Sequence, residues 1–284
     1  MPATRQCNFC NNPLPRSASL CPHCGRPGLY PNVEDAEDHD ERAALDRRYK
    51  AALTESARRG ADEAIKNFEA AAADSKAVLA RSPGDLLRLA NSDHDLFATY
   101  YQLRRAGLRI SKGDEWDYRR RLADHALFPD FEEHITFAAL SLDGIGLSNY
   151  GACSIVLRND MIAHRASVFE ENSVLFTERH RVAMKKGKVP HGYRAPWADR
   201  GKLCATKLHA RIDADTEHDE YSGLLMSQGT TSEEDQFVEA HIFGFWTART
   251  IEQVSVSKRR KKADNISIKW LNELRKFGVT VKTR

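Results

Sequence analysis

Hydrophobic residues recur every three or four positions through much of the first half of the chain, which is typical of amphipathic helices. The pattern follows an acidic run at residues 34–41, extends to residue 81 and is interrupted at Gly60, so it predicts two successive helices. Pro83, in the stretch SPGD, then ends the second helix because proline cannot continue one, and another helical pattern follows. Two further helices are expected within residues 93–127, separated by a turn at 111–115.

From about residue 132 the pattern changes to short apolar or alternating runs, separated by turns rich in Gly, Asn and Asp. Such runs predict strands. They are HITFAALSL (134–142), YGACSIVLR (150–158), SVLF (173–176) and EAHIFGFW (239–246). After Gly244 the pattern turns helical through Val254, a helix is expected at KLCATKLHA (202–210), and the tail predicts a helix and a short strand. The fold class is therefore α+β, with a mostly antiparallel sheet in the second half.

Charge and hydropathy exclude some classes of protein. Lys and Arg number 43 against 40 Asp and Glu, so the formal charge of +3 does not mark a nucleic-acid binder, and such a role would need local patches. No stretch approaches the roughly 18 consecutive apolar residues of a membrane span, and residues 1–6 resemble neither a signal core nor a transit peptide. We expect a soluble cytoplasmic protein that does not enter a membrane.

Four cysteines near the start of the chain have the spacing of a metal site. Two CxxC pairs separated by ten residues supply the four thiolates that zinc prefers in closed structural sites: Cys7, Cys10, Cys21 and Cys24. Too few apolar residues surround them for an unassisted core, so zinc is expected to hold the segment folded. Residues 5–28 resemble the short prokaryotic zinc ribbons found at the ends of many unrelated proteins. That resemblance implies a module that docks nucleic acid or protein, or a stabilising cap. Catalysis is not expected, because four thiolates leave no open coordination position.

An acid and an imidazole share one face of the strand predicted near residue 240. Alternation along a strand places Glu239 and His241 on one side and their apolar neighbours on the other, so both can point into a cleft. A carboxylate between apolar neighbours is either functional or held in an ion pair on a solvated face.

Two other segments carry groups suited to ligand binding. The segment DGIGLSNYG (143–151) places three glycines between two predicted strands, where the backbone can approach a ligand closely or simply connect the strands. The string HRASVFEENS (164–173) gathers Arg, Ser, Glu, Asn and His around a short apolar pair. Together these segments offer hydrogen-bond donors for a diphosphate.

In order along residues 130–256, these elements resemble the ADP-ribosyltransferase-like toxin fold: the YG-initiated strand ending in VLR, then RASVFEENS, then EAHIFG followed by Thr-Ile. The resemblance implies a split, mostly antiparallel β-core that binds NAD in a cleft. Glu239 would be the late-strand glutamate that stabilises an oxocarbenium-like transition state as nicotinamide leaves, Arg165 or His134 the early basic residue, and Ser167 or Tyr150 the second motif. The candidate catalytic residues are Glu239, His241 and Tyr150, and the candidate NAD-binding residues are His134, Gly151, Arg165, Ser167 and Asn172.

The sequence departs from the pattern of this family at two points. It has no clean Ser-Thr-Ser triplet, and Phe237 stands two residues before Glu239, where arginine-modifying members carry Gln or Glu. A nucleic-acid or small-molecule acceptor is therefore favoured over a protein arginine.

Two basic segments could bind phosphates. Residues 179–211 are dense in Lys, Arg and His, with Tyr193 and Trp197 interleaved, and residues 257–262 form a second block. Both segments could equally be solvated loops. A protein partner could instead contact the zinc ribbon or the helices within 37–81.

The sequence thus predicts a zinc ribbon at 1–30, a helical region at 31–128 and an α+β domain with the chemistry at 129–284. The first hypothesis is an NAD-dependent ADP-ribosyltransferase acting on an intracellular macromolecule, as a toxin or defence effector. The alternatives are a non-enzymatic zinc-ribbon protein that binds nucleic acid, and a nuclease that uses His164 or His241 with a carboxylate.

Overall fold

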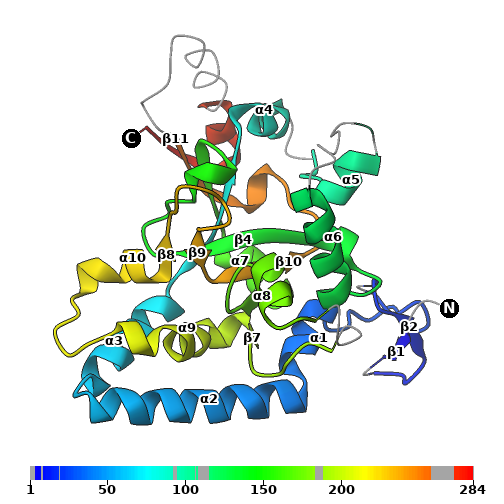
Figure 1. Cartoon of the computed structure of the whole chain (residues 1–284). Coiled ribbons are helices and arrows are strands. Elements are labelled where there is room, and N and C mark those ends of the chain that lie inside the picture. Colours follow the sequence, from blue (N-terminus) through cyan, green and yellow to red (C-terminus); the bar gives the residue numbers. More distant parts are fainter. Residues whose placement is uncertain are drawn as a thin grey trace.

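An eight-stranded β-sheet forms the centre of the computed structural model (Figure 1). The structure describes residues 4–7, 9–18, 20–91, 95–105, 107, 115–182, 188–256 and 272–283. The strand order is β12-β11-β5-β3-β4-β10-β6-β7, and every neighbouring pair is antiparallel except β11 and β12, which run parallel. The strands of this sheet are β3 Lys76–Arg81, β4 Ile135–Ser141, β5 Cys153–Leu157, β6 Ala166–Phe169, β7 Arg194–Pro196, β10 Glu239–Phe243, β11 Ile251–Val256 and β12 Thr280–Thr283.

Two short hairpins and a set of helices accompany the sheet. The hairpins pair β1 Thr4–Gln6 with β2 Pro13–Pro15 and β8 Met226–Ser227 with β9 Gln236–Phe237. The α-helices are α1 Pro31–Glu37, α2 His39–Arg58, α3 Asp62–Ala73, α4 Pro83–Asn91, α5 Tyr100–Arg105, α6 Glu115–Leu127, α7 Asn159–Ile162, α8 Ser173–Arg179, α9 Arg200–Leu208 and α10 Tyr221–Leu225. Short 3-10 helices are η1 Glu132–His134, η2 Ser148–Tyr150, η3 Ala163–Arg165, η4 Trp197–Asp199, η5 His209–Arg211, η6 His218–Glu220, η7 Ala248–Thr250 and η8 Asn272–Phe277. The predicted α+β class and the mostly antiparallel sheet are confirmed. The eight strands form one continuous hydrogen-bonded series, without the expected split.

The helices α2, α3 and α9 lie together beside the sheet, with α3 and α9 between α2 and the strands (Figure 1). The buried positions of α3 include Ile65, Phe68 and Ala72, whose spacing of three and four places them on the face that enters the main core. Gly201 lets α9 approach α3 closely, because a Cβ there would lie 2.5 Å from the carbonyl oxygen of Glu69. The sequence pattern therefore predicted these helices.

Residues 76–81 form a strand rather than the end of a helix, so the helical prediction was wrong there. Helix α3 ends at Ala73, and β3 then pairs with β4 on one side and β5 on the other. Four successive residues, 77–80, are buried, as expected for a strand in the middle of a covered sheet. The sheet thus takes one central strand from the region expected to be helical.

Two further segments differ from the prediction. Residues 173–176 were expected to be a strand but begin α8, where the Asn172 side chain accepts a hydrogen bond from the backbone N–H of Val174 at 2.9 Å. The strand lies just before it, as β6. The helical pattern expected after Gly244 gives only the single turn η7, because residues 251–256 pair with β5 and β12 as strand β11.

The N-terminal hairpin contacts the main sheet through α1. Two ion pairs link the hairpin segment to α1: Arg5 with Glu34 at 2.6 Å and Arg16 with Asp35 at 2.5 Å. The buried Asn32 side chain of α1 donates to the backbone oxygen of His241 at 2.9 Å, which lies on β10. Among the described helices, none is long and apolar enough to cross a membrane.

Candidate functional site

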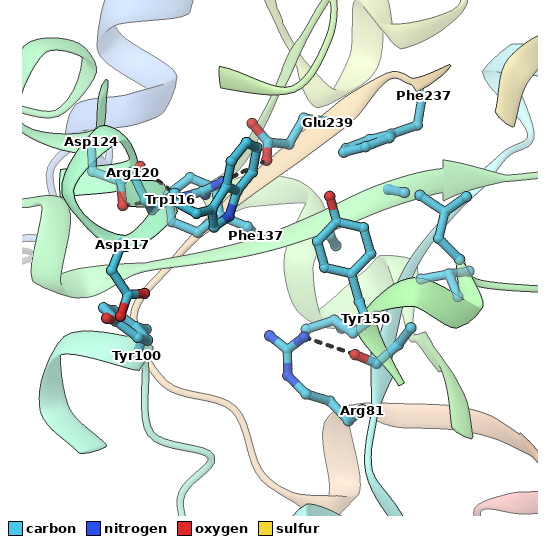
Figure 2. Close-up of a pocket in the computed structure, with 16 residues that line it drawn as sticks. Arg81, Tyr100, Trp116, Asp117, Arg120, Asp124, Phe137, Tyr150, Phe237 and Glu239 are labelled. Atoms are coloured by element: carbon cyan, nitrogen blue, oxygen red, sulfur yellow. Dashed lines mark hydrogen bonds and ion pairs between the residues drawn. The ribbon is translucent and has the colours of Figure 1, made fainter. Parts of the chain in front are cut away.

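A cavity of about 220 Å³ lies where β3, β4 and β10 meet α5 and α6 (Figure 2). Its wall is rich in aromatic rings, and three carboxylates and two guanidinium groups interrupt the apolar surface. The lining residues are Val78, Leu79, Ala80, Arg81, Tyr100, Trp116, Asp117, Arg120, Asp124, Phe137, Ala138, Ala139, Leu147, Tyr150, Phe237 and Glu239. Such a combination of apolar wall and few polar groups is typical of a ligand site.

Glu239 is the first residue of β10, between β4 and β6, and is only 2% exposed. Its Oε2 accepts hydrogen bonds from the backbone N–H of Ser173 at 2.9 Å and from His241 Nε2 at 3.1 Å. The latter contact confirms that the acid and the imidazole share one face of the strand. The other oxygen, Oε1, lies 3.6 Å from Nη1 of Arg120.

The surroundings of Glu239 favour its charged form. Burial by itself would raise the pKa, but the Arg120 guanidinium and the donors of His241 and Ser173 outweigh it and hold the pKa below its ordinary value. Burial lowers the pKa of His241, whose ring packs edge-on against Phe128 at 4.7 Å. An ionised glutamate can accept from a neutral imidazole that donates from Nε2.

Arg120 reaches the cavity from α6 and lies between two buried carboxylates. Its Nε is 3.0 Å from Oδ1 of Asp124, and its guanidinium carbon lies 3.7 Å from the centre of the Phe137 ring. Tyr101 donates its hydroxyl to the other Asp124 oxygen at 2.8 Å. Burial raises the pKa of Asp124 to about 6 despite these partners. Figure 2 shows Arg120 beside Trp116, facing Glu239.

Tyr150 stands across the cavity from Arg120, on η2 (Figure 2). Its ring meets that of Phe237 edge-on at 6.3 Å, and its hydroxyl lies 3.4 Å from the side-chain nitrogen of Asn172. Burial raises the pKa of Tyr150 to about 12, so the phenol is neutral at ordinary pH. Glu239, Tyr150 and Asn172 therefore come together from three separate parts of the sequence.

None of the predicted NAD-binding residues lines this cavity, Asn172 included, and neither does His241. Arg165 is buried and donates to the backbone oxygens of Phe243 at 2.6 Å and Phe245 at 2.7 Å, so it braces the chain after β10. Ser167 lies opposite His241 on β6 and accepts from Asn32. The Arg165 and Ser167 side chains therefore form contacts that stabilise the fold.

His134 and Gly151 also have structural surroundings. The His134 ring stacks on Phe243, with 5.4 Å between ring centres. Gly151 allows a close backbone approach, as its sequence context suggested, but the neighbouring chain is β3: a Cβ at Gly151 would lie 2.3 Å from the carbonyl carbon of Arg81. His164, considered for a nuclease, contacts the Tyr30 ring at 5.7 Å and does not line the cavity.

Sequence reasoning missed the contribution of α6. Trp116, Arg120 and Asp124 are spaced by four residues, so they lie on one face of the helix and enter the cavity together. The available signal was an aromatic, a cation and an acid at helical spacing, which is also common on solvated helices. Arg81 was likewise missed, because the segment that carries it was predicted to be helical.

The four N-terminal cysteines form a group that could hold a metal ion, since their sulfur atoms all lie within 4.8 Å of one another. Cys7 Sγ is 3.7 Å from Cys24 Sγ, and Cys10 Sγ is 3.6 Å from Cys21 Sγ. Four sulfurs at bond lengths of about 2.3 Å around a tetrahedral ion are about 3.8 Å apart. The separations therefore fit a four-thiolate metal site and are far too long for disulfides.

The described part of the basic segment 179–211 uses several of its groups internally. Arg200 donates to the backbone oxygen of Trp197 at 2.9 Å and covers its buried ring. Lys207 donates to the backbone oxygen of Phe237 at 2.8 Å. The basic block at 257–262 lies outside the described residues.

No family model and no curated protein matches this chain.

Proposed function

We propose that this chain is an ADP-ribosyltransferase-like enzyme that cleaves the bond between nicotinamide and ribose in NAD, with Glu239 as the central catalytic group. The observation that carries the proposal is the buried Glu239 carboxylate at an aromatic-lined cavity, opposite Tyr150. Arg120 and the donors around Glu239 keep it ionised. A carboxylate held in this state is suited to stabilising a cation in the transition state.

The chemistry follows from the charges that change during the reaction. The nicotinamide ring of NAD is cationic, and the faces of Trp116 and Tyr150 can bind such a ring. As the C–N bond breaks, its electron pair neutralises the nicotinamide, and positive charge develops on the ribose carbon. The Glu239 carboxylate stabilises that charge. An acceptor hydroxyl or amine then forms the new bond to this carbon and releases its proton to solvent, or water does so and gives free ADP-ribose.

The N-terminal module is the proposed docking part of the enzyme. Zinc, held by Cys7, Cys10, Cys21 and Cys24, would keep the segment folded, since among its described residues the buried cluster consists only of Cys7, Leu14 and Cys21. A nucleic acid is the proposed macromolecular acceptor, with a protein as the alternative, and a toxin or defence role belongs to the same proposal.

The test is NAD turnover by the purified full chain in the presence of cell extract, with NAD labelled in its adenylate part. Glu239→Gln keeps the size of the side chain but removes its charge, and we expect a loss of about 100-fold or more in nicotinamide release and label transfer. Glu252→Gln is the matched control, because Glu252 lies on β11 and pairs with Lys76 outside the cavity. It should keep wild-type turnover.

Two results would count against the proposal. Equal turnover by wild type and Glu239→Gln would remove Glu239 from the chemistry. If wild type consumes no NAD but binds RNA or DNA, and Glu239→Gln binds equally well, the non-enzymatic nucleic-acid-binding hypothesis is supported instead.

A further inference from the structure

Arg120 has the geometry of a group that aligns another side chain. Its guanidinium is held on three sides: by Asp124 at 3.0 Å, by the Phe137 ring at 3.7 Å, and by Glu239 at 3.6 Å. The side chain is only 17% exposed, so these contacts are poorly screened by water. A planar fork fixed in this way has little freedom to turn away from Glu239.

A purely structural ion pair would need only Arg120 and Asp124, which are four residues apart on α6. Arg120 instead also contacts a carboxylate on β10, a strand more than a hundred residues later in the chain. The cavity lies at this junction, and both Arg120 and Glu239 line it. The contact between Arg120 and Glu239 therefore joins α6 to β10 at the cavity.

We infer that Arg120 is a positioning residue, which holds the Glu239 carboxylate aimed into the cavity, and that Asp124, itself held by Tyr101, holds Arg120 in turn. The consequence for the rate rests on the proposed function, whereas the effect on Glu239 itself does not. On this inference the helix α6 is part of the functional site rather than a separate helical region.

Several groups around this network can titrate or carry charge. Glu239 faces Arg120 from α6, His241 on its own strand and the N–H of Ser173 at the start of α8. Tyr150 lies across the cavity, and burial raises its pKa to about 12, so the phenol is neutral at ordinary pH. Asp124 faces Arg120 and the Tyr101 hydroxyl of α5. Removal of Arg120 thus leaves Glu239 with neutral donors only, provided that His241 is neutral.

The first measurement follows Glu239 without any substrate. Histidine-selective 15N NMR reports the ring of His241, whose Nε2 contacts Glu239, and the signal is assigned by its absence in His241→Gln. In Arg120→Gln the cation that lies 3.6 Å from Glu239 is lost. The midpoint of the pH-dependent change in the His241 signal should therefore move upward by about 1 pH unit or more. Arg120→Lys keeps the charge and should recover part of the shift. Arg121→Gln, an exposed position on the same helix, is the control and should leave the midpoint unchanged.

A second variant guards against misfolding. Arg120→Gln leaves Asp124 without its cation, so the double variant Arg120→Gln/Asp124→Asn removes both charges of the pair. Its midpoint is compared with that of Asp124→Asn alone, because Asp124 repels Glu239 and its removal offsets part of the shift. A midpoint no higher in the folded double variant than in Asp124→Asn would overturn the inference.

The second measurement is the pH profile of NAD turnover. In Arg120→Gln the acid limb should move upward by the same interval as the NMR midpoint, with kcat lowered more than KM is raised. If wild type shows no turnover, the proposed function fails, while the NMR midpoint still decides the role of Arg120. Turnover that depends on Glu239 but has the same pH profile in wild type and Arg120→Gln would refute the role of Arg120 alone.

Discussion

Replacement of Gly151 by alanine should force apart two backbone segments beside the cavity. The new Cβ would lie 2.3 Å from the carbonyl carbon of Arg81 and 2.5 Å from its Cα and N. Ordinary contacts at such a position begin at 3.4 Å, so the loop after η2 and strand β3 would have to separate by about 1 Å. All three of these Arg81 atoms belong to the backbone, so they cannot move aside as the end of a flexible side chain could. Overpacking of this kind typically costs about 1–3 kcal/mol.

The matched control is Gly223→Ala in α10, where a new Cβ meets nothing within 4 Å. Alanine is favoured over glycine in a helix by about 0.5–1 kcal/mol, so this variant should be as stable as wild type or slightly more stable. Urea unfolding followed by circular dichroism gives the midpoint and the slope for each protein. The Gly151→Ala midpoint should fall with little change in slope. Equal midpoints for the two variants would refute the close approach of residue 151 to β3.

Two further predictions concern the metal site and the buried acid. The purified chain should contain zinc. Cys10→Ser should lose the zinc and unfold the N-terminal hairpin, while the circular dichroism of the sheet is unchanged. A zinc-free wild type that retains this hairpin would contradict the prediction. Burial raises the pKa of Asp124 from 3.8 to about 6, so the folded chain binds more protons than the unfolded chain between these values. This part of the stability, at most about 3 kcal/mol, is present at low pH and is lost as pH rises through 6. Urea titrations at pH 4 and pH 8 give the free energy of unfolding of each protein. Asp124→Asn should lack the decline between the two pH values, and an identical decline in wild type and variant would contradict the prediction.

The sequence predicted those features that depend on neighbouring residues. The spacing of apolar residues predicted α2 and α3, with a break at Gly60, which adopts the positive φ of 72° that favours glycine. Strand alternation placed Glu239 and His241 on one face, as their 3.1 Å contact confirms. In each case the signal lies within a few residues of the feature.

Features that depend on distant partners could not be predicted in this way. The segment KAVLAR follows a helical pattern, but it forms strand β3 by pairing with β4 and β5. These partners begin more than fifty residues later, so no local pattern shows the pairing. The same holds for Arg120, since no local pattern shows that α6 faces Glu239. Arg165 illustrates the opposite case: its polar surroundings suggested ligand binding, but the structure gives its donors to the backbone after β10.

The N-terminal module is also less separate than its sequence suggests. A four-cysteine module that precedes an acidic stretch could be a tethered domain. In this chain, however, Glu34 and Asp35 of that stretch form ion pairs with Arg5 and Arg16 of the module. On the same helix, Asn32 donates to the backbone of His241, two residues from Glu239. A macromolecule bound by the module would therefore be held at a fixed position relative to β10. If the proposed function is correct, such placement would lower the entropic cost of bringing a docked acceptor to the reacting carbon.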